Sequence, residues 1–150
     1  MKNLELARIF TELGQLLEYQ GDSPFKINAY RRAAVVMEEL GEDVAKLAAE
    51  DRLRDVPGVG EAIANKIKEF LETGKVRRHQ EELAKAPSGF FDLIALPGIG
   101  PRTVALLHQH LGVETVADLQ GAAAEGKIEG LPGIGKKKAE NIAKALNGAP

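Results

Sequence analysis

The sequence predicts an all-α protein, and three features of its 150 residues lead to that prediction. Apolar residues recur at intervals of three and four along its first third, which is the spacing of one face of a helix. A Pro-Gly-aliphatic-Gly turn then occurs three times, each time beside segments of helical character. The spacers between these copies show no alternation of apolar and polar residues, so we expect no strands in them.

The first third should form two long helices and a short one. In the first helix, an apolar stripe follows spacings of four, three and four residues: Leu6, Phe10, Leu13 and Leu17. The second helix should run from Pro24 to about Leu40, with Ser23 as its N-cap and Pro24 at the first helical position. It should bury residues at helical spacing: Ile27, Tyr30, Ala34 and Met37. A short helix over 44–48 should follow.

Three copies of one motif organise the rest of the chain, over residues 55–67, 95–107 and 130–142. In each copy we expect an aliphatic helix to lead into the Pro-Gly-aliphatic-Gly turn and a second helix to start directly after it. The spacers leave room for one further helix each. Thr115 to Asp118 resembles a capping box with Asp in place of the usual Glu, which predicts a helix start in the last spacer.

Composition narrows the classes of function. With 20 Lys and Arg against 22 Asp and Glu, the net charge of −2 excludes a uniformly basic nucleic-acid binder and a polybasic membrane binder, but not a local basic patch. The absence of Cys excludes disulfides, thiolate metal sites and a Cys nucleophile, and it fits a reducing compartment. No apolar run approaches the roughly 20 residues that cross a bilayer, so we expect neither secretion nor membrane insertion.

The repeated turn has the chemistry of a phosphate site. Two glycines permit backbone angles that other residues avoid, and the aliphatic residue between them can anchor the turn in the core. The amides of the turn and of the next helix's first turn can then approach an anion closely, and such contacts read no base. The alternative is a plain helix-helix turn, but three copies in one context favour the phosphate site. Its glycines are Gly58, Gly60, Gly98, Gly100, Gly133 and Gly135.

Two other glycine motifs do not fit. The run from Gly130 to Lys137 nearly spells a P-loop, but Lys137 stands where that motif needs Ser or Thr for magnesium, and no hydrophobic strand precedes it. The dinucleotide-binding fingerprint requires a third glycine three residues after the second one. Neither Gly60 nor Gly100 is followed by a glycine at that spacing. We therefore expect no nucleotide site of either kind.

The three copies resemble helix-hairpin-helix DNA-binding motifs, and their order resembles one family in particular. The segments Phe25–Ala34 and Val56–Lys75 are similar to the amino-terminal lyase domain of the DNA polymerase X (polymerase-beta-like) family. The later turns, Leu96–Arg102 and Leu131–Lys137, resemble the segment that follows it in bacterial members. The resemblance implies a helical lyase-like domain over 1–86 and a tandem helix-hairpin-helix domain over 87–150, separated at 86–89.

The resemblance also implies a function in DNA repair, including base excision repair, in the bacterial cytosol or nucleoid. The expected partner is gapped, nicked or single-strand-containing DNA, with other repair proteins or a polymerase domain as further partners and no membrane. Polymerisation is not expected of this chain, because nucleotidyl transfer needs clustered carboxylates for two metal ions and its Asp residues are scattered. A non-catalytic scaffold that holds a protein partner is a further alternative.

A lyase activity is implied through Lys66, which stands where the family has the lysine that forms a Schiff base with an abasic or 5′-deoxyribose-phosphate sugar. Tyr30 and Lys26 match other pocket positions, and a cation such as Lys26 would favour the neutral amine. The alternative is that Lys66 only contacts phosphate. Departures from the eukaryotic pattern favour that alternative: Phe25 replaces a His, Ala62 a Lys and Asn65 a Glu.

Further contacts complete the expected site. Besides the six glycines, the side chains expected on DNA are Arg31, Lys68, Lys75, Arg78, Arg102, Lys136 and Lys137. No cofactor is expected to be required. The resemblance implies that a Na⁺ or K⁺ ion bridges turn and phosphate through the backbone carbonyls of Arg54, Val56, Val59, Ile94, Leu96 and Ile99.

Overall fold

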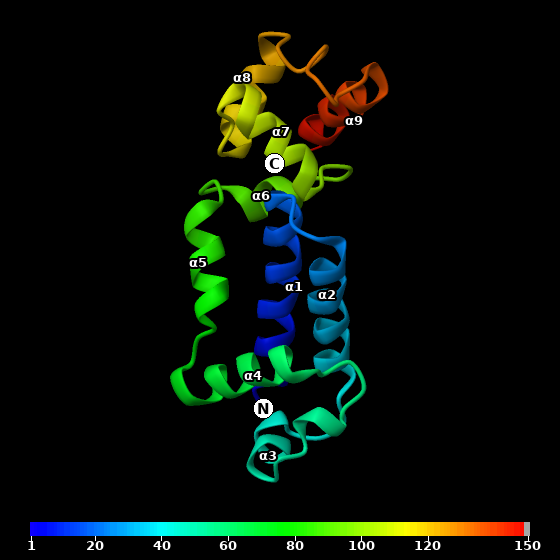
Figure 1. Ribbon diagram of the computed structural model, residues 1–150. Helices are drawn as coiled ribbons and strands as arrows, with labels where there is room; N and C mark the ends of the chain where they lie inside the picture. The colour runs from blue at the N-terminus through cyan, green and yellow to red at the C-terminus, as the bar shows by residue number, and fades with distance from the viewer. Residues whose placement is uncertain (149–150) are drawn as a thin grey trace. The chain divides into compact units, whose positions relative to one another are not determined.

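The computed structural model describes residues 1–148, and within that range it is helical and holds no strand, as the sequence predicts (Figure 1). The chain divides into two compact units, Met1–Lys85 and a second from Ala86 onward. This division falls one residue before the predicted one, and the last two residues of the predicted 87–150 domain lie outside the described residues. No described helix is long and apolar enough to cross a membrane.

The first unit is built on two long helices that lie side by side (Figure 1). Its elements are α1 (Asn3–Gln20), α2 (Pro24–Glu39), α3 (Val44–Ala49), the 3₁₀ helix η1 (Leu53–Asp55), α4 (Glu61–Thr73) and α5 (Arg77–Lys85). Helix α5 packs against α1. The predicted stripes of α1 and α2 are buried in one aliphatic core. This core fixes α2 and the turn that precedes α4 in one rigid unit.

Local signals set the helix ends where the sequence predicts them. Helix α1 stops at Gly21, which adopts a left-handed φ of 75° and donates its amide to the last turn. Helix α2 starts at Pro24, and the Ser23 hydroxyl accepts the amide of Phe25 at 3.2 Å. Helix α8 has Thr115 as its N-cap, whose hydroxyl accepts the amide of Asp118.

Helix α5 is held by buried polar contacts rather than by an apolar stripe. His79 and Glu82 are its buried residues. His79 Nε2 lies 2.7 Å from Glu12 Oε1 on α1, and Glu82 Oε1 accepts hydrogen bonds from Arg78 and Lys85. The basic face of α5 is therefore partly neutralised by carboxylates of its own unit.

The second unit contains α6 (Phe90–Ile94), α7 (Pro101–Leu111), α8 (Val116–Ala124) and α9 (Lys136–Asn147). Its buried residues are mainly aliphatic and come from all four helices and from the turns: Phe90, Leu93, Ile99, Val104, Leu107, Val113, Leu119, Ile128, Ile134 and Ile142. Gly89 lies against the neighbouring backbone, where a Cβ would be 2.7 Å from the Glu114 carbonyl oxygen. The aliphatic core thus ties the second and third turns into one unit.

One expectation about the repeat is wrong. We predicted an aliphatic helix before each turn, but only the second turn follows an α-helix, the five-residue α6. The first turn follows the 3₁₀ helix η1, and the third follows a loop. In that loop Gly126 and Gly130 have positive φ values of 70° and 89°, which end α8 and prevent a new helix from forming before Ile134.

Candidate nucleic-acid interface

The three Pro-Gly-aliphatic-Gly turns share one backbone conformation. The first glycine of each turn lies in the left-handed region, with φ values of 93° at Gly58, 78° at Gly98 and 81° at Gly133. These angles strain any residue with a Cβ, which explains why glycine stands there. The second glycine is the N-cap of the helix that follows at once, as predicted: Gly60 for α4, Gly100 for α7 and Gly135 for α9.

The aliphatic residue of each turn anchors it in the core, as the sequence predicts. Val59, Ile99 and Ile134 are all buried. The amide of each donates to the carbonyl three residues earlier, at 3.0, 3.1 and 2.9 Å respectively. A backbone hydrogen bond therefore closes each turn, and the buried aliphatic side chain anchors the turn in the core.

The helix starts after the turns carry no side-chain cap. At α2, α3 and α8 a side chain accepts a first-turn amide, whereas none does so at α4, α7 or α9. A Cβ built on the second glycine of each turn meets nothing within 4 Å. Each helix thus presents uncapped amides in open space, beside its positive dipole end, which is an arrangement suited to an anion such as phosphate.

The first glycines differ in their surroundings. A Cβ on Gly58 would lie 2.9 Å from Val36 Cγ2, and one on Gly133 would lie 2.9 Å from Leu106 Cδ1. A Cβ on Gly98 would meet nothing within 4 Å. The first and third turns are therefore packed on a neighbouring helix, while the second is open on this side.

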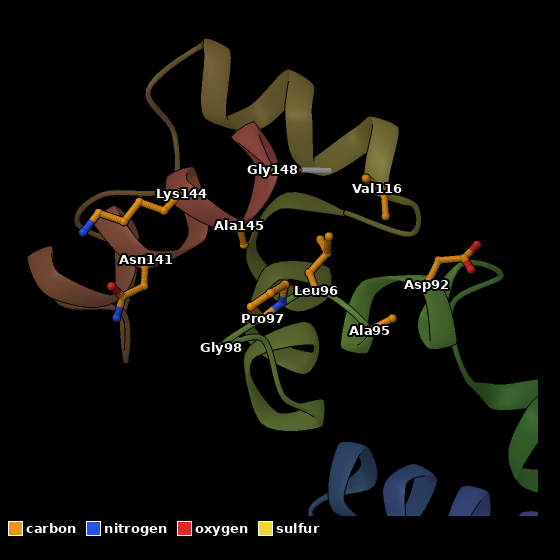
Figure 2. Close-up of a pocket in the computed structure, with 10 residues that line it drawn as sticks. All are labelled: Asp92, Ala95, Leu96, Pro97, Gly98, Val116, Asn141, Lys144, Ala145 and Gly148. Carbon is orange, nitrogen blue, oxygen red and sulfur yellow. The ribbon is translucent and has the colours of Figure 1, made fainter. Parts of the chain in front are cut away.

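The open side of the second turn faces a cavity of about 800 Å³ within the second unit. Figure 2 shows its lining, in which α9 contributes Lys144 and Asn141, and Asp92 lies on the α6 side. The floor between them is largely apolar: Ala95, Leu96, Pro97, Val116 and Ala145. This groove lies beside the turn glycine Gly98.

The predicted basic contacts fall into two groups. Five are exposed and make no ion pair within the described part of the chain: Lys68, Lys75, Arg102, Lys136 and Lys137. Arg31 is paired with Glu18 at 3.2 Å, and Arg78 is paired with Asp22 and Glu82 at 3.6 and 3.1 Å. The first group is free to bind phosphate, while the second would have to exchange a carboxylate for it.

Lys66 lies where its helical pattern places it, at the edge of the buried stripe of α4. Ile63, Ile67 and Phe70 are buried and Lys66 is half-buried. Its Nζ is 5.9 Å from the centre of the Tyr30 ring, and Tyr30 is only 8% exposed. The tertiary structure therefore brings together two of the three residues predicted for the lyase pocket.

The third predicted pocket residue, Lys26, has a carboxylate partner of its own. Its Nζ is 3.8 Å from Oδ1 of Asp22, a half-buried residue of the turn that precedes α2. Asp22 offsets the positive charge that Lys26 was expected to present to Lys66. The assistance expected from Lys26 is correspondingly reduced.

Two arginines that the sequence analysis did not assign to DNA line the first turn. Arg32 of α2 lies against Gly58, where a built Cβ would be 3.2 Å from its Nε. Arg32 and Arg54 border a cavity of about 570 Å³ with the turn residues Pro57–Gly60. Neither makes an ion pair within residues 1–148, whereas Arg52 pairs with Glu42 and Glu50. The hydrogen bond from Arg52 to Glu50 raises the pKa of that guanidinium above its ordinary value.

The backbone carbonyls named for a monovalent cation lie around the first two turns. Those of Val56 and Leu96 each accept one amide, from Val59 and Ile99. A carbonyl oxygen has two lone pairs, so each retains one for an ion. Among residues 1–148 no group of three or more His, Asp or Glu side chains is placed to hold a metal ion.

Comparison with known proteins matches both units to family models. Residues 1–76 match the model of a helix-hairpin-helix domain, and residues 90–147 match that of a SAM-like helix-hairpin-helix tandem. The DNA polymerase/3′-5′ exonuclease PolX of Bacillus subtilis is 33% identical to this chain. The aligned region covers 99% of this chain and 26% of PolX. The Holliday junction branch migration complex subunit RuvA is 31% identical in an Acidovorax species and 32% in a Polaromonas species, over 63% of this chain. The chain spans about a quarter of the length of PolX and half that of RuvA.

Proposed function

This chain belongs to the helix-hairpin-helix proteins and corresponds to the amino-terminal helix-hairpin-helix region of the PolX family, and we propose on that premise that it binds gapped, nicked or otherwise damaged DNA without reading sequence. The observation that carries the proposal is the set of three uncapped helix starts at Gly60, Gly100 and Gly135. Backbone amides hold phosphate and distinguish no base, so the binding is independent of sequence.

The distribution of charge supports the same proposal. The chain carries a net charge of −2, yet Lys136 and Lys137 open α9 without an ion pair in the described residues. Lys68 on α4 is likewise exposed and unpaired there. Local lysines beside the turns can contact phosphate although the whole chain has little long-range attraction for DNA. Binding therefore depends on the amides and these few lysines together.

Salt dependence tests the proposal. If three of the unpaired lysines and arginines beside the turns each neutralise one phosphate, log K should fall with log salt at a slope of about −2.7, and affinity should drop about 40-fold between 50 and 200 mM salt. Fluorescence anisotropy with a labelled gapped duplex measures this slope, and a second duplex of unrelated sequence should bind within about twofold. A flat salt dependence contradicts the proposal. Absence of binding to any DNA would favour a protein-interaction scaffold instead.

A monovalent cation at the first two turns is a separate part of the proposal. The carbonyls that would hold it are those of Arg54, Val56, Val59, Ile94, Leu96 and Ile99. The ion supplies a positive charge between the turn and a DNA phosphate.

Exchanging the cation at constant ionic strength tests that site. Replacing K⁺ or Na⁺ with tetramethylammonium should weaken DNA binding several-fold, because the bulky ion cannot enter a ring of carbonyls. Anisotropy titrations in the two chloride salts measure the difference. Equal affinities would show that no cation site contributes to DNA binding. The proposed phosphate contacts of the backbone amides would still stand.

A lyase activity is a second candidate function, favoured by the proximity of Lys66 to Tyr30. In this proposal the neutral Lys66 amine adds to C1′ of the open sugar, and loss of water gives an imine. Removal of a proton from C2′ then lets the C3′–O bond break, and the phosphate leaves with that electron pair. Hydrolysis of the imine returns the amine. The Tyr30 ring, 5.9 Å from the Lys66 Nζ, orients the side chain in this proposal.

A further inference from the structure

We propose that the groove beside Gly98 in the second unit is a docking site for a helix of a partner protein, which inserts one aliphatic side chain against the second turn. This site goes beyond DNA binding, because its largely apolar lining suits a protein surface. The groove holds about 800 Å³, and its floor consists of apolar residues: Ala95, Leu96, Pro97, Val116 and Ala145. This volume lies within the range of pockets that hold small organic groups.

An aliphatic side chain of a helix covers the first glycine at the other two turns. A Cβ on Gly58 would be 2.9 Å from Val36 of α2. A Cβ on Gly133 would be 2.9 Å from Leu106 of α7. At Gly98 a Cβ would meet nothing within 4 Å, and the groove lies there instead. The second turn therefore lacks the aliphatic side chain that packs on the first and the third.

The repeat in the sequence explains the missing side chain. When residues 95–107 are aligned with 130–142, Leu106 corresponds to Asn141. Leu106 packs on the turn of the other copy, whereas Asn141 is exposed and lines the groove together with Gly98. A polar residue thus stands where the repeat has an aliphatic one. The groove is the unfilled counterpart of the place that Leu106 occupies, so an aliphatic side chain presented by a helix fits it.

Charged side chains flank the apolar floor. Lys144 lies on the α9 side and Asp92 on the α6 side (Figure 2). Both are exposed, and neither makes an ion pair within residues 1–148. The Asp92 carboxylate repels phosphate, so the groove suits a peptide better than a DNA strand.

These charges define the partner. Residues four positions before and after a given residue lie on the same face of a helix. A helix with a leucine between a lysine and a glutamate at this spacing therefore presents an ammonium group to Asp92, a carboxylate to Lys144 and an aliphatic side chain to the floor. Recognition of an amphipathic helix in an apolar groove is a recurring mode of peptide binding.

A labelled helical peptide tests the proposal. The probe is alanine-rich, with one central leucine, a lysine four residues before it and a glutamate four residues after it. It should bind saturably, as measured by fluorescence anisotropy. Replacing its leucine with alanine should weaken binding about 10-fold or more, because most of the buried apolar area is lost. Replacing its lysine and glutamate with glutamine should weaken binding several-fold.

Asn141→Leu supplies the missing side chain from the chain itself. This variant should bind the leucine peptide about 10-fold more weakly or worse, and its midpoint of thermal unfolding should not fall. Asn147→Leu is the matched control, because Asn147 is an exposed asparagine of the same helix that does not line the groove. It should bind the peptide like the unchanged chain. Circular dichroism confirms that each variant is folded.

Several results would overturn the docking site. They are failure of the unchanged chain to bind the leucine peptide, equal affinity for the leucine and alanine peptides, and undiminished binding by Asn141→Leu. Self-association of the unchanged chain that Asn141→Leu abolishes, measured by sedimentation, would assign the groove to a second copy instead. Each of these outcomes leaves the proposed DNA binding standing, since its salt dependence is measured without the peptide.

Discussion

Lys66→Ala and Lys66→Arg should each abolish the covalent adduct that borohydride traps between this chain and DNA with a 5′-deoxyribose phosphate. Borohydride reduces the imine to a secondary amine, so an adduct forms only where an amine has condensed with the sugar. Lys66 is half-buried at the edge of the α4 stripe, with Nζ 5.9 Å from the Tyr30 ring. Arginine keeps the positive charge but cannot form the Schiff base under these conditions.

The two variants also separate catalysis from phosphate binding. Lys66→Arg should bind gapped DNA within about twofold of the unchanged chain while losing the adduct entirely. Lys46→Ala is the control, since Lys46 is an exposed lysine of α3 that lines no cavity of the candidate site. Lys46→Ala should form the borohydride-trapped adduct to the same extent as the unchanged chain. An adduct that persists in Lys66→Ala would assign the reaction to another amine, and no adduct with the unchanged chain would remove the lyase proposal.

Gly58→Ala should lower the free energy of unfolding of the first unit by about 2–4 kcal/mol. Two effects add in this estimate. The φ of 93° strains any residue with a Cβ, and the new methyl would lie 2.9 Å from Val36 Cγ2 and 3.2 Å from Arg32 Nε. Because α2 is buried along its other face, Val36 cannot withdraw far. Urea denaturation followed by circular dichroism measures the loss.

Gly60→Ala is the matched control in the same turn. Gly60 has an extended backbone with φ of −89°, and a Cβ there meets nothing within 4 Å. Its stability should fall by no more than about 1 kcal/mol, because alanine is a poorer N-cap than glycine but meets no clash here. The methyl would nevertheless stand in the open space where phosphate is proposed to approach the amides of α4, so DNA affinity should fall several-fold. Normal DNA binding by Gly60→Ala would contradict a phosphate contact at this turn.

Gly98→Ala separates the two effects at Gly58. Gly98 has a comparable φ of 78°, but no atom lies within 4 Å of the Cβ position. Only the backbone strain remains, so the second unit should lose about 1 kcal/mol. A loss as large as that of Gly58→Ala would show that strain rather than the contact with Val36 dominates at both turns.

Short-range patterns predicted the helices and turns well. Ser23 and Pro24 start α2 because a hydroxyl cap and a fixed φ act over two residues. The turn glycines and their aliphatic anchors are likewise recognisable within four residues. The aliphatic α-helix expected before the first and third turns was wrong. Before the third turn, a few apolar residues beside Gly126 and Gly130 cannot sustain a helix.

The distribution of free charge could not be predicted in this way. Arg31 and Arg32 are adjacent in the sequence, yet Glu18 of α1 pairs with Arg31 while Arg32 lies against Gly58 of the first turn. Arg78 is predicted to contact DNA, and the structure pairs it with Asp22 and the buried Glu82. Each of these outcomes depends on a residue from another element, at a distance that helical periodicity does not encode.

The sequence by itself thus determined the all-α class, the helix starts and the three Pro-Gly-aliphatic-Gly turns, because those features depend on interactions between residues a few positions apart. Only the tertiary structure decided which turn is packed and which is open, which arginines line the first turn, and that Lys66 lies beside Tyr30. These features depend on how the helices and turns of each unit pack around the core of that unit, and side chains far apart in the chain become neighbours only when that core forms.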